Sequence, residues 1–517
     1  MLIMAFAAWV IQTDFVTLFL TCNVFYPKRN SRMTLKDLEP RRVWVQFDAI
    51  TRVPRPSKRE GRIIEYLVDF ARRHAIDCER DDAGNVVMRI PAAAGCEAVP
   101  VVTLQSHMDM VCEKRGDVEF DFDRDPIRTR VEDGWVRAEG TTLGADCGIG
   151  MAAALALLLD PPAEHGALEA LFTVDEETGL TGAFNLGEGM IGGKYLINLD
   201  SEDEGEIFIG CAGGVDTVAT LRCEREAAPE EYVYYRFDAA DMLGGHSGDD
   251  IDKGRANSVK VAARFVAAAA AKCGARLARI EGGNLRNAIP RESYAVVGVA
   301  KGQETELMAM FESFADKIKA EYHMTEPRMR LTLTPVAAPD TVFAASSQQA
   351  LIGALMGVAC GVLAMSQTVK GLVETSTNLA SVKEPQQGNV VITTSQRSSV
   401  DSAKEYAMLM VESVFRLAGA EVAHSDGYPG WAPNPDSLLL RRTTECYLRL
   451  FGSEAKVRAI HAGLECGLFL EKYPHLEMVS FGPTMRGVHS PDERLEIASV
   501  DKFWRLLREV VTAVARE

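Results

Sequence analysis

The sequence predicts an α/β fold in which one domain, built on a mostly parallel β-sheet, is interrupted by an inserted α+β domain. Over residues 81–205, short apolar runs typical of buried strands alternate with a helical pattern. From about Gly214 the strands instead alternate apolar and polar residues, as strands with one exposed face do. The first kind of pattern resumes near residue 395.

Length and charge limit the class of protein. The chain has 517 residues, which favours two or more domains, and its 25% charged residues are ordinary for a soluble globular protein. The net charge of −17, without a basic stripe, argues against a nucleic-acid partner. The 11 cysteines are odd in number and include no C-x-x-C pair. This favours a reducing compartment over a disulfide framework.

Residues 1–26 form an apolar stretch whose only charge is Asp14. It is long enough to span a bilayer, but no basic residue precedes it and Asp14 would be costly in hydrocarbon. Met33 opens a conventional soluble start. We therefore interpret residues 1–32 as a non-native or disordered extension from an over-extended translation start, and we expect no membrane partner. A membrane anchor is the alternative.

The main domain is expected over residues 33–213 and again over 395–517. Its first part begins with a helical pattern at residues 61–76 and a strand within 81–90. A glycine-rich turn leads into a helix at 142–160. Three further apolar strands end in His, Asp or Glu, in residues 100–111, 167–179 and 194–205. In open α/β sheets, sites gather at the carboxyl ends of strands, so these polar ends are expected to meet.

The inserted domain is expected over residues 214–394. Amphipathic helices are predicted at 256–274 and 304–322, among strands at 215–226, 231–242, 275–300 and 329–336. Residues 351–365 are apolar but short and interrupted by three glycines. They are therefore interpreted as a helix followed by a loop rather than as a membrane span.

Two motifs in the first part could bind metal. His107 and Asp109 are two apart in a strand and share a face, so the carboxylate can orient the imidazole and leave its other nitrogen for a metal. Asp146 lies in a tight turn at a helix start, where it can bridge two cations or simply cap the helix.

Acids follow the later strands. Glu176 and Glu177 are expected to close a strand and to point to opposite sides, so that one binds metal while the other acts as a base toward water. A solvated acidic turn is the alternative. Asp200 ends a further strand, beside Glu202, Asp203 and Glu204, which are expected to be solvated.

His489, in a loop bounded by glycine and proline, completes the set. Nitrogen and oxygen ligands of this mix suit Zn²⁺, with Mn²⁺ or Co²⁺ as alternatives.

The order of these motifs resembles a known family. The motifs SHMD, GADCGIG, DEETG, NLDSEDEG and GVHSPDE look like the metal-site motifs of the peptidase D group of aminoacyl-histidine dipeptidases, the bacterial carnosinase type. This group lies in the clan of co-catalytic zinc peptidases. GGHSG, GGNLRNAIPRE and IHAGLECGLF are also similar to it, and the resemblance runs from about Leu35 to the C-terminus.

The resemblance implies a role for each residue. Two zinc ions are expected, one on His107 and Asp200 and the other on Glu177 and His489, with Asp146 bridging both. Glu176 would be the general base, and Asp109 would orient His107. Cys147 departs from the asparagine of relatives. Because the family has a cis peptide bond after the bridging aspartate, that bond is in doubt here.

The lid residues follow in the same way. The resemblance implies that His246, from the inserted lid, supplies the oxyanion donor. Asn287 and Arg291 are expected to grip the substrate carboxylate, since an arginine fork suits a carboxylate. Glu465 is expected either to meet the substrate α-amine or to be a structural acid.

The implied protein is a cytoplasmic, homodimeric zinc dipeptidase with a catalytic domain and a lid. It would hydrolyse small Xaa-His peptides, including β-alanyl-histidine. The alternatives are an N-acyl amino acid deacylase or tripeptidase of the same clan, a non-catalytic metal-binding protein on this fold, and a membrane-tethered form of the enzyme.

Overall fold

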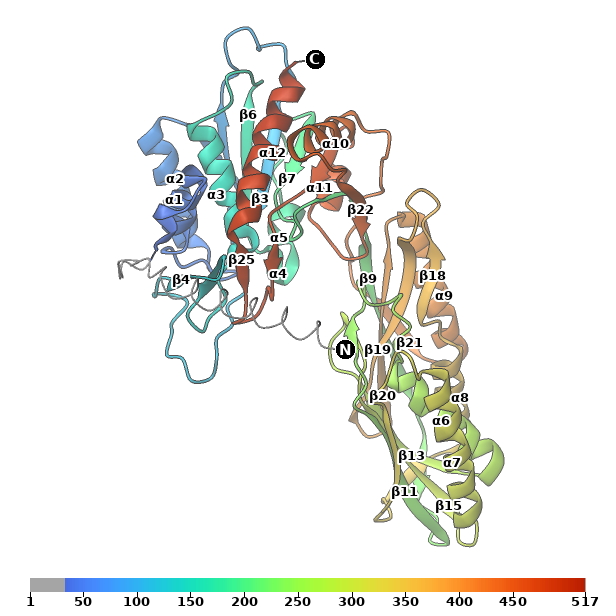
Figure 1. Ribbon diagram of the computed structural model, residues 1–517. Helices are drawn as coiled ribbons and strands as arrows, with labels where there is room; N and C mark the ends of the chain where they lie inside the picture. Colours follow the sequence, from blue (N-terminus) through green and yellow to red (C-terminus); the bar gives the residue numbers. More distant parts are fainter. Residues whose placement is uncertain (1–32, 517) are drawn as a thin grey trace, which may run out of the picture.

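The structure is a computed structural model that describes residues 33–516. The interpretation of residues 1–32 concerns a segment outside the described residues. Between residues 33 and 516, no helix combines the length and the hydropathy needed to cross a bilayer. The chain forms two units, each built on its own large sheet (Figure 1). The predicted α/β class is confirmed.

The first unit contains an eight-stranded sheet in the order β1-β2-β6-β3-β7-β23-β8-β22. Four of its seven strand pairs are parallel, including all those at its centre, so the sheet is mostly parallel as predicted, and β2 and β8 run antiparallel to their neighbours β6 and β23. The strands are β1 (Asp77–Arg80), β2 (Val86–Ile90), β3 (Val102–His107), β6 (Leu168–Thr173), β7 (Tyr195–Asn198), β8 (Glu206–Cys211), β22 (Lys456–Ile460) and β23 (Glu477–Ser480).

Two apolar layers cover this sheet, because successive strand residues face opposite sides. Val86 and Ile197 belong to a core with η1 (Leu35–Asp37), α1 (Arg41–Ile50), α2 (Gly61–His74), α3 (Ala145–Leu159), α10 (Leu438–Phe451) and α12 (Ile497–Ala515). Val87 and Leu196 belong to a second core with α5 (Thr181–Phe184) and α11 (Cys466–Lys472). α3 is apolar almost all round and correspondingly buried, which fixes its first turn at the sheet edge.

A smaller sheet positions a loop near that edge. It has the order β24-β25-β5-β4, with β24 (Met485–Arg486), β25 (Arg494–Glu496), β5 (Trp135–Ala138) and β4 (Thr129–Glu132). β24 and β25 pair antiparallel, with Arg486 opposite Arg494. The loop between them, which contains His489, is therefore held at both ends.

The second unit is a nine-stranded sheet with helices on one face (Figure 1). Its helices are α6 (Ser258–Cys273), α7 (Glu304–Glu321), α8 (Ala345–Gly357) and α9 (Asp401–Leu417). Its strands are β9 (Gly213–Arg222), β11 (Tyr232–Ala240), β13 (Arg276–Gly282), β15 (Ser293–Ala300), β16 (Arg330–Val336), β18 (Gly361–Met365), β19 (Val373–Gln386), β20 (Asn389–Ser398) and β21 (Glu421–His424). Two short pairs complete it, β10 (Arg225–Ala227) with β17 (Thr341–Phe343) and β12 (Gly245–His246) with β14 (Ala288–Ile289). The apolar residues 351–365 thus form α8 and an edge strand, where a helix and a loop were expected.

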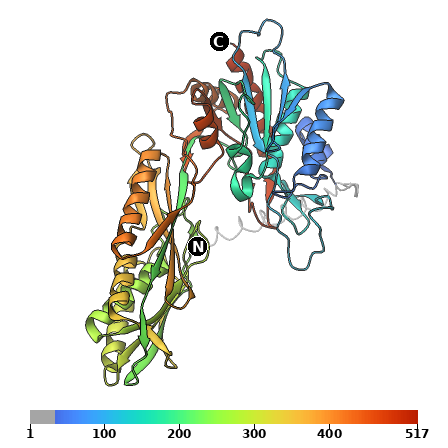
Figure 2. The same ribbon diagram turned by 180° about the vertical axis from the view of Figure 1, so that it is seen from behind.

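The chain passes between the units at β9 and again after β21 (Figure 2). The predicted boundary at residue 394 falls inside β20, and both α9 and β21 pack on the second sheet. The edge strand β21 follows α9 in the sequence, and hydropathy patterns did not reveal that it pairs with β9. We therefore propose that the inserted unit ends after His424 rather than at residue 394.

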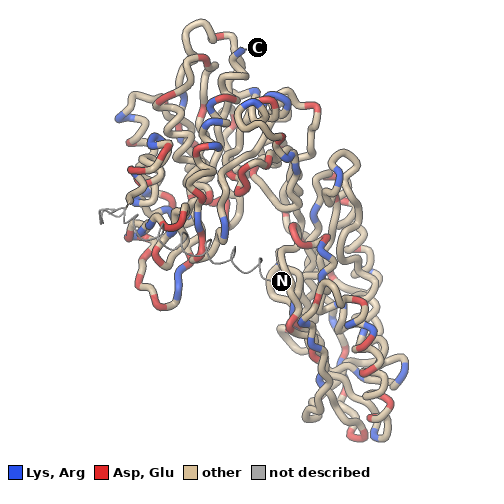
Figure 3. Tube along the Cα trace, viewed as in Figure 1, with Lys and Arg blue, Asp and Glu red and all other residues tan. Residues whose placement is uncertain are grey.

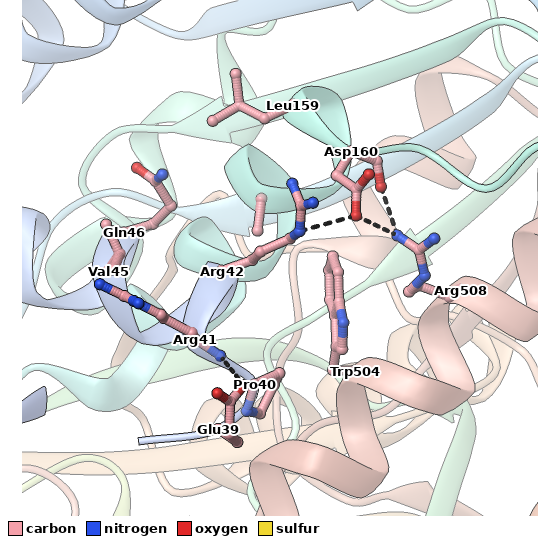
Figure 4. Close-up of a pocket in the computed structure, with 11 residues that line it drawn as sticks. Glu39, Pro40, Arg41, Arg42, Val45, Gln46, Leu159, Asp160, Trp504 and Arg508 are labelled. Atoms are coloured by element: carbon pink, nitrogen blue, oxygen red, sulfur yellow. Dashed lines mark hydrogen bonds and ion pairs between the residues drawn. The ribbon is translucent and has the colours of Figure 1, made fainter. Parts of the chain in front are cut away.

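One hollow of the described chain lies away from the polar strand ends. It has a volume of about 740 Å³ and lies among α1, the end of α3 and α12 (Figure 4). The Asp160 carboxylate lies between Arg42 and Arg508, at 3.0 and 3.4 Å, so both guanidinium groups already have an acidic partner. Along the chain trace, acidic and basic residues are interspersed in both units (Figure 3).

Candidate active site

A pocket of about 310 Å³ opens at the carboxyl ends of the central strands. Both parts of the main unit contribute to its walls, and Asp249 of the second unit lines it as well. The predicted site residues that line it are Asp146, Glu176, Glu177, Asp200 and His489. The strand ends predicted from the sequence therefore do meet.

His107, the last residue of β3, is buried between carboxylates. Its Nε2 lies 3.1 Å from Asp146 and 3.3 Å from Asp200, and its Nδ1 lies 3.3 Å from Asp109. Burial opposes charge on this imidazole, but the carboxylates, Asp200 first, raise its pKa well above the usual range. Asp109 also accepts hydrogen bonds from Ser57 and from the amides of Glu176 and Glu177, so its orientation is fixed.

Asp146 faces both histidines from the first turn of α3. Its second oxygen lies 3.2 Å from Nε2 of His489, which also lies 3.0 Å from Glu177. Burial opposes the charge of Asp146, but the two histidines hold the pKa of this carboxyl well below its usual value. The carboxylate of Asp146 thus lies between two groups of side chains, one with His107 and Asp200 and the other with His489 and Glu177.

Cys147 follows this aspartate, and the Asp146–Cys147 peptide bond is cis. The thiol is fully buried and donates to the carbonyl of Leu199 at 3.3 Å. The residue that departs from the family pattern therefore keeps the expected bond geometry.

Glu176 and Glu177 do not close a strand. β6 ends at Thr173, and the two acids begin the one-turn helix α4 (Glu176–Gly179). Strand alternation therefore does not separate their roles, and both line the pocket. Burial raises the pKa of Glu176 well above its usual range.

The pocket fits divalent cations. His107, Asp146 and Glu177 each offer a ligand atom within 4.8 Å of the others, and so do His107, Cys147 and Asp200. Oε1 of Glu177 is buried without a hydrogen-bond partner among residues 33–516, which is costly unless a cation satisfies it. Nitrogen and carboxylate oxygen suit zinc, and the thiol is a further soft ligand in reach.

The second unit contacts the main unit beside this pocket. Nε2 of His461 lies 2.7 Å from Oγ of Ser376 on β19. His246, on β12, accepts the amides of Gly248 and Asp249 at Nδ1, at 3.3 and 3.2 Å. An acceptor at Nδ1 leaves the ring proton on Nε2, so this imidazole is a hydrogen-bond donor in its neutral form.

A neighbouring pocket of about 220 Å³ is lined by Asn287 and by Arg397, a residue that the sequence analysis missed. Arg397 is 7% exposed, donates to Tyr428 at 3.0 Å and has an Nε without a partner in the described chain. Arg291 is exposed and does not line this pocket. The signal available in the sequence was a lone arginine in the otherwise uncharged polar run TTSQRSS, residues 393–399.

Two glutamates bear on the expected roles: Glu465 has the contacts of a structural acid, one of its two alternatives, and Glu202 differs from expectation. Glu465 is 1% exposed and accepts from Gln105 at 2.6 Å and Thr173 at 2.7 Å, so it belongs to a buried network behind the pocket. Glu202, expected to be solvated, lines the pocket, and burial raises its pKa to about 8. Its neighbours are paired instead, Asp203 with Arg486 and Glu204 with Lys502.

Known proteins are similar along nearly the whole chain. The profile of Peptidase family M20/M25/M40 matches residues 103–513. The cytosol non-specific dipeptidase of Escherichia coli (strain K12) is 42% identical over 480 residues, 93% of this chain and 99% of that protein. The crystal structure of aminoacylhistidine dipeptidase from Vibrio alginolyticus is 40% identical, with a TM-score of 0.86 and coverage of 93% and 98%. A tripeptidase of Staphylococcus aureus shares the fold, with a TM-score of 0.54 at 17% identity and coverage of 93% and 100%.

Proposed function

The chain belongs to Peptidase family M20/M25/M40 and is an enzyme that hydrolyses peptide bonds, and we propose that it is a two-zinc dipeptidase that cleaves Xaa-His peptides. The observation that carries this proposal is Asp146, whose two carboxylate oxygens face His107 and His489 beside Glu176. A shared carboxylate between two groups of ligands is what a pair of cations requires.

The ligands divide as follows. His107 and Asp200 would hold one zinc ion, Glu177 and His489 the other, and Asp146 would bridge them. Bound there, zinc would polarise the scissile carbonyl. Mn²⁺ and Co²⁺ suit the same donors. Asp109 keeps the ring of His107 oriented through Nδ1.

The protons are handled by this chain's own residues. Glu176 takes the proton of the attacking water and passes it to the leaving amine, and its raised pKa supports this role. His246 donates from Nε2 to the developing oxyanion. Its Nδ1 is already occupied by two backbone amides, which supports the required tautomer.

The substrate carboxylate is assigned to Arg397 and Asn287, which line one pocket, with Arg291 nearby in sequence. Arg397 is buried, and its Nε has no hydrogen-bond partner among residues 33–516, so it can bind a carboxylate without breaking an existing ion pair of those residues.

The substrate α-amine is assigned to Glu202 rather than to Glu465. Of the seven carboxylates lining the pocket, four lie near a basic side chain, namely Asp146, Glu177, Asp200 and Asp203. Asp249 lies on the second unit, beside Nδ1 of His246. Glu176 is the general base, which leaves Glu202. Glu465 is held by Gln105 and Thr173 and does not line the pocket. A carboxylate facing a free ammonium would select peptides with an unmodified N-terminus.

We further propose a cytoplasmic homodimer that forms through the second unit. The E. coli relative is named as a cytosolic protein. β18 pairs with β19 along one edge, and Leu363, Met365 and Met356 expose 38%, 47% and 45% of their surface there and on α8. Sedimentation of wild type and of a Met365→Glu variant tests this assembly. Identical monomeric sedimentation of both would contradict it.

The proposed activity is tested with the zinc-loaded protein on a panel of peptides. β-Alanyl-histidine and glycyl-histidine should be cleaved, and Ala-Ala tests the breadth that the name of the E. coli relative suggests. A tripeptide and an N-acetyl amino acid represent the alternative activities of the clan. Cleavage of the last two alone would overturn the dipeptidase assignment.

A further inference from the structure

Arg55 is a buried cation beneath the proposed metal site. It lies between α1 and α2, and its side chain is among the largest that are fully buried. Nη1 donates to the carbonyls of Met108, at 3.1 Å, and Asp109, and Nη2 donates to the carbonyl of Gly144. One planar guanidinium thus joins the residues after His107 to the turn before Asp146.

The glycines of that turn make room for Arg55. A Cβ atom at Gly144 would lie 2.6 Å from its Nη2, and a Cβ at Gly148 would lie 2.7 Å from the same atom. Both distances are shorter than real carbon contacts. Gly144 and Gly148 therefore pack directly against a guanidinium, which explains why these two positions are glycines.

Glu493 holds the same turn from the opposite side. It is 2% exposed and follows His489 by four positions. Its two oxygens accept the amides of Leu143 at 2.7 Å, Gly144 at 3.0 Å, Ala145 at 2.7 Å and Asp146 at 3.5 Å. The loop that contains one histidine thus binds the backbone that contains the shared aspartate.

The two side chains act together on three proposed ligand segments. Arg55 ties the His107 segment to the Asp146 turn, and Glu493 ties that turn to the His489 loop. Both groups are buried, and Glu493 is one of the two carboxylates whose charge acts on Arg55. Removing the charge of Arg55 would leave Glu493 buried with only backbone amides as partners, and removing the charge of Glu493 would leave Arg55 buried with Asp109 as its one remaining acid.

We propose that Arg55 and Glu493 are positioning residues that set the spacing of His107, Asp146 and His489, and thereby the affinity of the site for metal. The inference rests on the proposed two-zinc function. Neither residue lines the pocket, so each acts through the backbone of the ligands. Residues that orient metal ligands typically change metal affinity about 10–100-fold when they are replaced.

The test separates positioning from stability. Arg55→Gln and Glu493→Gln are made singly and together, and the zinc Kd and the melting temperature of the zinc-free protein are measured. Each single variant should lose stability, and the double variant should regain part of it because no lone charge remains buried. Zinc binding should stay weakened by about tenfold or more in all three.

Two further variants of this chain complete the test. Arg55→Lys retains the charge but cannot reach both segments, so it should lose less stability than Arg55→Gln and still bind zinc weakly. As a matched control, Arg225 and Glu384 form a 2.9 Å ion pair with 12% and 7% exposed side chains in the second unit. Replacing both by Gln should leave the zinc Kd unchanged.

Zinc affinity that returns together with the melting temperature in the double variant would overturn the positioning role. Wild-type zinc affinity in Arg55→Lys would do the same. A wild type that binds no zinc would overturn both this inference and the proposed function, so the two failures are distinguishable.

Discussion

The carboxylate of Asp146 and the imidazole of His489 lie 3.2 Å apart although 343 positions separate them in the sequence. The inserted unit lies between them in the chain, so both parts of the main unit must be assembled before the pair exists. Asp146 also meets His107 at 3.1 Å. The shared aspartate is therefore the point where the two groups of proposed ligands join.

Replacing Asp146 should affect both metals. Asp146→Asn keeps the shape but leaves a single acceptor oxygen, so both zinc ions should be lost, whereas His489→Ala should lose mainly one. Elemental analysis after dialysis at fixed free zinc measures the ratio of metal to protein. Asp492→Asn, at an acid with 73% of its side chain exposed, is the control. Full occupancy in Asp146→Asn would rule out the shared-ligand arrangement.

Replacing Glu202 tests whether this side chain recognises a free amine on the substrate. A hydrogen bond to a charged group contributes about 1.5–3 kcal/mol, so Glu202→Gln should lower kcat/KM for β-alanyl-histidine by about 10–100-fold. N-acetylated β-alanyl-histidine, which lacks the ammonium, should not lose further rate. Asp203→Asn is the matched control, because Asp203 already pairs with Arg486 at 2.7 Å. Equal losses for both substrates would argue that Glu202 does not contact the amine.

His461 should make the contact between the units sensitive to acid. Burial and the nearby Arg397 lower its pKa to about 4, below the ordinary value of 6.5. Above pH 6.5 the ring is neutral in both states and its contribution is complete. As the pH falls from 6.5 to 4, only the unfolded chain takes up the proton, and stability falls by an amount on the order of 3 kcal/mol.

The free energy of urea unfolding, measured between pH 4 and 7, checks this loss. His461→Gln should show a shallower dependence on pH, whereas a variant of the exposed His475 should match wild type. The same slope in His461→Gln and wild type would show that another group titrates in this range.

Much of the site could be predicted because its residues end strands or occupy glycine-rich turns. His107, Asp146 and Asp200 lie where the topology of an α/β sheet brings residues together, and the order of motifs then identified the family. Glu176 and Glu177 were placed in the right pocket for a wrong local reason, since they begin a helix and do not end a strand.

The rest depended on burial that no local pattern reveals. Glu202 stands among acids that look alike in sequence, and only the fold pairs Asp203 and Glu204 with basic residues. Arg55 is one of four basic residues in the segment 51–60, and only the packing of the turn around Gly144 against it shows its role. The antiparallel strands and the boundary after His424 likewise depend on long-range pairing.

The central claim is that a metal site with Glu176 as its general base hydrolyses dipeptides. The most direct test measures zinc content and β-alanyl-histidine hydrolysis on the same samples of wild type, Glu176→Gln and the control Glu188→Gln, at an exposed acid nearby. Glu176→Gln should keep its zinc and lose about 10²–10⁴-fold in kcat, with Glu188→Gln unchanged. Near wild-type hydrolysis by zinc-loaded Glu176→Gln would contradict the account.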